Sequence, residues 1–413
     1  MPRQQLNYDR VGDDDGRKES LETLLPKLDI MMSELYGPDG LPIANGGVPT
    51  IYFRTPANLR RWHAALAKVR AGLGRARVVF IGDSKTVGTG AGTSSGNTWT
   101  DGAEPRSKVA HFTRQLTAAG IPTNRNAWFG SSGLASPAAK VAYDARLTIG
   151  AGWSGGPQTL GGVSWATNGT TSINFAAAGN TDTLESFFRL RSADGQGSIT
   201  VDASPTVLTT LNVSPPAEQP GKATATTTLG AHTWNVQRTG GGFLNFVGMI
   251  AYDSTAPAVD IINGGAFGTV SGYHASTNSS TIDAATMLSV IQPNLVIIQL
   301  GTNNLNVGWD LAVYTADILD IITNAKAAGA DVVLEVPTFG QAGGYGTTAQ
   351  RQELRQALVG LGASQGCMVV DHDARFVSYT FANSLGLHRD TVPHETEPGY
   401  ADEAQALVNA LVF

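Results

Sequence analysis

Short apolar runs that alternate with amphipathic segments are the feature that most constrains the fold of this chain. The runs are RVVFIG (77–82), LVIIQLG (295–301), DVVLEVP (331–337) and CMVVD (367–371). A polar loop and a segment with helical spacing follow most of them. Strands that are apolar on both faces are typical of a parallel sheet covered by helices. The alternation therefore predicts an α/β domain.

The middle of the chain has a different pattern. Segments of residues 141–274 such as SINFAAA, GSITVDAS and HTWNVQRT alternate or carry β-branched and aromatic residues, with turn residues between them. We predict an all-β domain of the sandwich or jelly-roll type, inserted in the α/β domain. Its tryptophans Trp153, Trp165 and Trp234 leave two alternatives: rings that contact sugars, or rings that fill the core of the insertion.

The domain organisation follows from these patterns. We expect residues 1–50 to form an N-terminal arm and a helix, because apolar residues from Leu21 to Leu35 recur at helical spacing. This helix either packs on its own domain or joins copies of the chain. Residues 51–140 and 275–413 are predicted to form the two parts of the α/β domain, on either side of the insertion at 141–274.

Composition excludes several classes of partner and location. The formal net charge of −6 and the absence of a basic stripe exclude a nucleic-acid partner. The N-terminus has no apolar signal core, and no stretch of about 18 apolar residues occurs. We therefore expect no signal peptide and no membrane span, and a protein that is cytoplasmic as synthesised.

Polar residues follow the predicted strands at the places where an α/β sheet binds ligands. Ser84 comes just after the first strand, Asn303 follows the strand at 295–301, and Gly133 lies in the turn FGSSG. His394 precedes the last helix. Ligands of open parallel sheets bind outside the carboxyl ends of the strands. A serine in such a place is a candidate nucleophile, with a histidine as its base.

Four segments resemble the motifs of the SGNH, or GDSL, hydrolases, a superfamily of esterases and lipases. GDSK (82–85) is similar to the Gly-Asp-Ser-Leu block, with Lys85 in place of Leu. WFGSSG (128–133) is the loosest match, to an Asn-X-Gly-X-X-Gly turn, and has Trp128 in place of Asn. GTNN (301–304) is similar to Gly-X-Asn-Asp, and PHETEPG (393–399) to the block that carries the histidine.

The resemblance implies a flavodoxin-like three-layer α/β/α hydrolase domain and a role for each matched residue. Ser84 would be the nucleophile and His394 its base. The oxyanion hole would consist of the backbone N–H groups of Ser84 and Gly133 and the side-chain amide of Asn303. Asp390 would orient His394, although it lies four residues before the histidine where the family has three. If it lies out of line, a backbone carbonyl would orient the ring.

The expected function is that of a serine esterase without cofactor or metal. The sequence DHD (371–373) has no matching His or Cys pair at a spacing typical of metal sites. The preferred substrate is an O-acetylated polysaccharide or cell-surface glycan, because esterases of this superfamily with β-rich additions often resemble carbohydrate acetyl esterases. Two alternatives stay open: a lipase or thioesterase on the same scaffold, and a glycan-binding virion or adhesin protein with a vestigial hydrolase site.

The N-terminal segment suggests where such a protein would act. Residues 1–50 loosely resemble the leading segments of phage tail or capsid-decoration proteins. This resemblance implies a location in a virion, as a tail or capsid appendage. It also implies a homo-oligomer, which would be a trimer if the protein is a virion component.

Overall fold

The computed structural model describes residues 49–93, 101–134, 136–211, 215, 217–276, 282–341, 345–389 and 393–412. The chain divides into two compact units, residues 1–50 and 51–413. The predicted N-terminal helix lies outside the described residues, so its role in attachment or oligomerisation stays a prediction. No helix in the described ranges combines the length and apolarity needed to cross a membrane.

The α/β part of the second unit is built on a seven-stranded sheet. Its order is β1 (Ile51–Tyr52), β16 (Met368–Asp371), β15 (Asp331–Val336), β14 (Leu295–Gln299), β2 (Ala76–Gly82), β13 (Val259–Gly265) and β3 (Thr123–Asn124). All neighbours are parallel except β1, which pairs antiparallel with β16. Five of these strands are neighbours in the spatial order β13, β2, β14, β15 and β16. If they are renumbered 1 to 5 along the chain, this order is 2-1-3-4-5, as in flavodoxin-like folds. The predicted fold class is confirmed.

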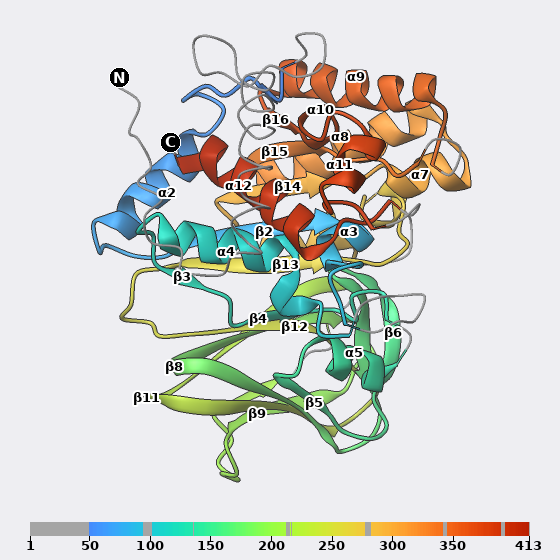
Figure 1. Cartoon of the computed structure of the whole chain (residues 1–413). Coiled ribbons are helices and arrows are strands. Elements are labelled where there is room, and N and C mark those ends of the chain that lie inside the picture. Colours follow the sequence, from blue (N-terminus) through green and yellow to red (C-terminus); the bar gives the residue numbers. More distant parts are fainter. Residues whose placement is uncertain are drawn as a thin grey trace, which may run out of the picture. The chain divides into compact units, whose positions relative to one another are not determined.

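Helices cover both faces of this sheet (Figure 1). One face packs against α2 (Arg60–Arg70), α4 (Lys108–Ala118) and α12 (Glu397–Val412), and the other against α6 (Ala284–Ile291), α8 (Leu311–Ala327) and α9 (Thr348–Gln365). Strand β2 shows why: Val78 and Phe80 belong to the first core, and Val79 and Ile81 to the second. Successive side chains of a strand point to opposite faces, so an apolar strand contributes to both cores.

A second sheet of nine strands forms the β-rich part of the unit. Its strands are β4 (Ala127–Phe129), β5 (Leu147–Ile149), β6 (Ser154–Thr159), β7 (Gly162–Thr167), β8 (Ser172–Leu190), β9 (Gln196–Val201), β10 (Thr209–Leu211), β11 (Gln219–Gly240) and β12 (Leu244–Tyr252). The long strands β8 and β11 pair with each other across two register irregularities. Five buried side chains of this part belong to the core under α6, α8 and α9: Phe129, Leu160, Phe187, Val247 and Ile250.

The predicted boundaries of the insertion do not coincide with the boundaries of the second sheet. Strand β13 lies inside the predicted range 141–274 but pairs with β2 in the parallel sheet, and β4 lies before it but pairs with β12. The reason for β13 is that its residues VDIINGG are buried on both faces, as a central strand requires. The division of the chain into separately folding domains stays a prediction.

The tryptophans of the insertion are core residues. Trp153, Trp165 and Trp234 are at most 4% exposed and belong to one apolar cluster. The indole N–H of Trp234 donates to Thr181 Oγ1 at 3.0 Å, which satisfies its polar atom inside the core. Of the two alternatives, packing is right, and these rings have no face free for a sugar.

The remaining helices of the described residues are short. They are α3 (Ser84–Val87), α5 (Pro137–Tyr143), α7 (Thr302–Val307), α10 (His372–Arg375), α11 (Tyr379–Ser384) and the 3-10 turns η2 (Glu104–Arg106) and η3 (Ser271–Tyr273).

Candidate active site

Ser84 lies where β2 turns into the short helix α3. The Asp83 carboxylate caps this helix by accepting from the Lys85 N–H at 3.0 Å. Gly82 is required by the tightness of the turn, because a Cβ there would lie 2.0 Å from Thr86 Oγ1. As the first residue of α3, Ser84 has a backbone N–H without a partner in its own helix. The turn thus presents a hydroxyl and a backbone donor at the carboxyl end of a central strand.

His394 lies against Ser84. Its Nε2 is 2.8 Å from Ser84 Oγ, a hydrogen bond between residues 310 positions apart. The loop after α3 packs on the same residue: a Cβ at Gly90, where φ is +100°, would lie 3.0 Å from His394 Cβ. Only glycine allows this approach. The structure therefore brings the predicted nucleophile and the predicted base together.

The surroundings of His394 favour its neutral form. Burial and the nearby Lys85 ammonium lower the pKa of His394 to about 4, against the opposing effect of Glu395. A neutral imidazole can accept the hydroxyl proton of a serine. No described residue is hydrogen bonded to His394 Nδ1, the atom that an orienting acid would contact. Asp390 lies outside the described residues, so its role in orienting His394 stays a prediction.

Asn303 is the second residue of α7, the helix that follows β14. Its Nδ2 donates to Thr269 O at 2.9 Å and to Asp83 Oδ2 at 3.3 Å, which ties it to the residue before Ser84. Its neighbour Asn304 is buried and holds Ser271 by two hydrogen bonds, from Ser271 N to Oδ1 at 3.1 Å and from Nδ2 to Ser271 Oγ at 2.9 Å. The two asparagines of GTNN therefore have different surroundings: one adjoins the serine turn and the other anchors a neighbouring loop.

The turn that contains Gly133 packs against a second glycine-containing turn, residues 263–268. The Gly133 N–H donates to Ser131 Oγ at 3.1 Å, and a Cβ at Gly133 would lie 2.7 Å from Phe267 N. The backbone of Phe267 donates in turn to Ser132 O at 3.1 Å. The N–H predicted to bind an oxyanion is thus already engaged, and it packs on the segment that follows β13.

That segment, NGGAFG (263–268), has every residue of the Asn-X-Gly-X-X-Gly pattern. Gly265 is paired with Gly82 in the parallel register of β13 and β2, so the turn starts beside the serine turn. Asn263 reaches across, and its Nδ2 donates to Thr86 O in α3 at 3.0 Å. Gly268 is exposed, has φ +72° and would have no atom within 4 Å of an added Cβ. No described residue accepts a hydrogen bond from its N–H.

Sequence reasoning does not assign this second turn to the site. The complete pattern is present at residues 263–268, but these residues fall inside the range 141–274 that is predicted as the insertion. Only the pairing of β13 with β2 shows that the segment after β13 adjoins Ser84.

A buried lysine supports the Gly133 turn. Lys140 Nζ donates to Ser132 Oγ at 2.6 Å and lies 4.8 Å from the centre of the Tyr143 ring, whose hydroxyl donates to Val87 O at 2.8 Å. Burial lowers the pKa of Lys140 to about 7. Helix α5 is thereby linked both to this turn and to the end of α3.

Lys85, which stands where the family has Leu, is fully buried. Its Nζ forms an ion pair with Glu395, the residue after His394, and donates to Thr338 Oγ1 at 2.7 Å. The Lys85 ammonium lowers the pKa of Glu395 to about 2, which keeps this carboxylate ionised despite its burial. In the sequence, Lys85 stands out as a charged residue in a segment of apolar and small residues. The sequence does not show that its partner is Glu395.

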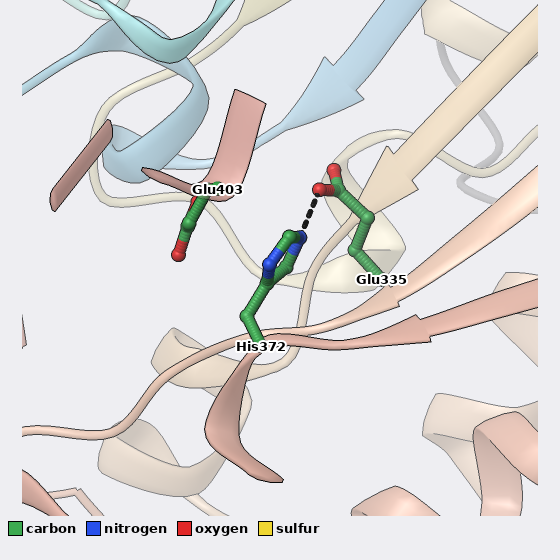
Figure 2. A group of neighbouring side chains, drawn as sticks. All are labelled: Glu335, His372 and Glu403. Atoms are coloured by element: carbon green, nitrogen blue, oxygen red, sulfur yellow. Dashed lines mark hydrogen bonds and ion pairs between the residues drawn. The ribbon is translucent and has the colours of Figure 1, made fainter. Parts of the chain in front are cut away.

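A second buried cluster offers groups that could bind a metal. Figure 2 shows His372 between Glu335 and Glu403, and the His372 Nε2 lies 2.6 Å from Glu335 Oε1. Lys108 Nζ, however, lies 2.8 Å from Glu335 Oε2 and 3.4 Å from Glu403 Oε2. The ammonium of Lys108 therefore already places a positive charge between the two carboxylates, and burial raises the pKa of Glu403, which favours its neutral form. Residues Asp371 and Asp373 of the DHD sequence instead pair with Arg355.

We expect this cluster to bind no divalent metal. A metal at Glu335 and Glu403 would face the Lys108 ammonium at close range, and like charges in a buried site repel strongly. Dialysis against a chelator should leave the thermal unfolding temperature unchanged, and added Zn²⁺ should not raise it. A rise with Zn²⁺ that disappears in a His372→Ala variant would contradict this assignment.

The chain resembles known proteins both in sequence and in fold. Residues 232–401 match the model of the GDSL-like Lipase/Acylhydrolase family, a range that includes Asn303 and His394 but not Ser84. No curated protein sequence matches the chain closely enough to count as a relative.

Solved structures of esterases resemble the chain. A peptidoglycan O-acetylesterase is similar with a TM-score of 0.62 and 18% identity, over 88% of this chain and 98% of that one. An acetyl xylan esterase, AlAXEase, matches at 17% identity and TM-score 0.30, over 38% of this chain and 81% of its own. A lipase/acylhydrolase from Enterococcus faecalis matches at 18% identity and TM-score 0.31, over 37% and 75%.

The first of these similarities shows a shared fold over most of both chains. It agrees with the flavodoxin-like strand order of the parallel sheet. Residues 232–401 are therefore similar in sequence to the GDSL-like lipases and acylhydrolases, and the chain has the fold of the SGNH hydrolases.

Proposed function

We propose that this protein removes O-acetyl groups from a polysaccharide or cell-surface glycan by a serine acyl-enzyme mechanism. The observation that supports this most directly is the 2.8 Å hydrogen bond between Ser84 Oγ and His394 Nε2 at the carboxyl end of the parallel sheet. A hydroxyl paired with a neutral imidazole is the arrangement of an activated serine nucleophile.

The proposed reaction has two steps. Ser84 Oγ forms a bond to the ester carbonyl carbon while its proton passes to His394 Nε2. The tetrahedral intermediate then breaks the bond to the alcohol oxygen, which takes the proton from the imidazolium. Water, deprotonated by the same imidazole, attacks the acyl-enzyme and releases the acid and the free serine.

For the oxyanion we propose the N–H groups of Ser84 and Gly268 and the amide of Asn303. Gly268 takes the role first predicted for Gly133, because the Gly133 N–H is engaged by Ser131 whereas Gly268 is exposed and lies on a turn that starts beside Ser84. To bind an oxyanion, the Asn303 amide would have to exchange its long 3.3 Å contact with Asp83 for the substrate.

The proposed donor set predicts the effect of removing Asn303. Loss of one oxyanion-hole donor typically costs on the order of 100- to 1000-fold in rate. We expect Asn303→Ala to lower kcat on p-nitrophenyl acetate by about that factor and to change KM little. Asn180→Ala, an exposed asparagine of β8, is the matched control. A kcat equal to that of the wild type would remove Asn303 from the donor set.

The glycan substrate is supported by the similarity to the peptidoglycan O-acetylesterase, which extends over nearly all of that chain. The buried tryptophans of the second sheet do not contribute to this argument, since they are core residues. A sugar would have to contact other side chains.

The test compares substrates on the same preparation. Acetate release from O-acetylated peptidoglycan and from acetylated xylan is measured beside hydrolysis of p-nitrophenyl esters with acyl chains from acetyl to octanoyl. We expect activity on acetyl esters and on at least one glycan. A preference for long chains would favour the lipase alternative, and no Ser84-dependent hydrolysis of any ester would favour the glycan-binding alternative.

A further inference from the structure

Two separate contacts join the segment that carries the nucleophile to the segment that carries the base. One is the Ser84–His394 hydrogen bond, and the other is the ion pair of the next residue in each segment, Lys85 with Glu395. Both side chains of the pair are 0% exposed. Two consecutive residues of α3, Ser84 and Lys85, are therefore bonded to two consecutive residues of the loop before α12.

A third segment closes this link. Thr338, which follows β15, accepts from Lys85 Nζ at 2.7 Å and donates its hydroxyl hydrogen to the Glu395 carboxylate. The Glu395 backbone is also tightly packed, because its carbonyl oxygen lies 2.4 Å from where a Cβ of Gly90 would be. The carboxylate of Glu395 therefore has little freedom to move, and neither has the histidine that precedes it.

We propose that Lys85 and Glu395 are positioning residues, whose ion pair holds His394 in line with Ser84 and sets the charge around the imidazole. The inference rests on the proposed esterase function and adds two residues to the nucleophile, base and oxyanion donors named there. Neither residue touches the reacting atoms. They act through the two backbone segments that they join.

The charges that face His394 come from two elements. Lys85 lies on α3, whereas Glu395 and His388 lie on the loop of His394 itself, where His388 and Glu395 form an isolated β-bridge. Lys85 and His388 lower the pKa of His394, and Glu395 raises it. Lys85 has the larger effect of the pair, so its removal moves the titration of His394 to higher pH whether or not Glu395 keeps its charge.

The test uses Lys85→Met, Glu395→Gln and the double variant, with Lys68→Met as the matched control. Lys68 is an exposed lysine on α2. Loss of one partner of a buried ion pair leaves an uncompensated charge, whereas replacement of both by neutral groups of similar volume is often tolerated. The double variant is therefore expected to fold even if a single variant does not.

The first readout is the titration of His394 followed by NMR, with its imidazole signal assigned by its loss in His394→Gln. We expect the titration midpoint to rise by about one pH unit in Lys85→Met and to rise also in the double variant. Lys68→Met should leave it unchanged. This readout does not need a substrate, so it decides the inference even if the wild type hydrolyses no ester and the proposed function fails.

The second readout is kinetic. We expect each single variant to lower kcat on p-nitrophenyl acetate by about 10- to 100-fold, since small misplacements of reacting groups cost rates of this size, and KM to change little. The double variant should lose no more than the worse single variant, because the two residues act as one unit. Folded Lys85→Met and double variants with the wild-type titration midpoint, or with the wild-type kcat in an active enzyme, would overturn the proposal.

Discussion

Ser84→Ala is expected to lower the esterase activity on the order of 10⁵- to 10⁶-fold, the size found when a serine nucleophile is removed from other hydrolases. The physical reason is that the alanine has no group to attack the carbonyl, and His394 then has no proton to accept. The residual rate would come from the oxyanion donors and from substrate binding. Hydrolysis of p-nitrophenyl acetate and labelling by a fluorophosphonate probe both measure this loss.

The matched control is Ser289→Ala, an exposed serine of α6 whose hydroxyl donates to Thr286 O at 2.8 Å. It should keep wild-type activity and wild-type labelling. A fluorophosphonate that fails to label active wild-type protein, or that labels Ser84→Ala equally well, would be incompatible with Ser84 as the nucleophile.

Asp390→Asn is expected to have the second largest effect, a loss of kcat approaching roughly 10⁴-fold with little change in KM. A carboxylate at His394 Nδ1 fixes the tautomer in which Nε2 accepts the serine proton, whereas an amide can donate to Nδ1 and select the other tautomer. Loss of the negative charge also lowers the pKa of His394, so the acid limb of kcat/KM should move to lower pH. The pH dependence of kcat/KM measures both effects.

For this effect, the segment from Asp390 to His394, which has five residues, must place its carboxylate where the four-residue Asp-X-X-His motif of the family places it. Val392 precedes Pro393, and the residue before a proline is driven toward extended conformations, which favours a bend in the segment. Glu397→Gln is the matched control, since this carboxylate is close to His394 in sequence but pairs with Arg106 and His111. Near wild-type turnover in Asp390→Asn would leave a Ser84–His394 dyad with a backbone carbonyl at Nδ1.

The sequence by itself determined the α/β class, because strands apolar on both faces can be buried only between two helical layers. It also determined that Ser84 and Asn303 lie at one edge, since the carboxyl ends of parallel strands meet there. The family motifs added His394. These inferences need only local patterns and the geometry of a parallel sheet.

Only the tertiary structure decided which glycine turn adjoins the serine. Both the turn of Gly133 and the turn of Gly268 follow β2 in the sequence, and either could lie beside Ser84. The chain passes through the whole second sheet before β13 returns to pair with β2. Strand pairing between distant segments is set by the burial of whole faces, which no local pattern reports. The expectation for Gly133 therefore gave way to the proposal of Gly268.

The same reason applies to the buried charges. Lys85 is visible in the sequence as a departure from the family motif, but its partner Glu395 lies 310 residues away along the chain. Likewise, Glu335, His372 and Glu403 could be taken for metal ligands until Lys108 is seen among them. A buried charge requires a partner, and its identity is fixed only when distant segments pack together in three dimensions.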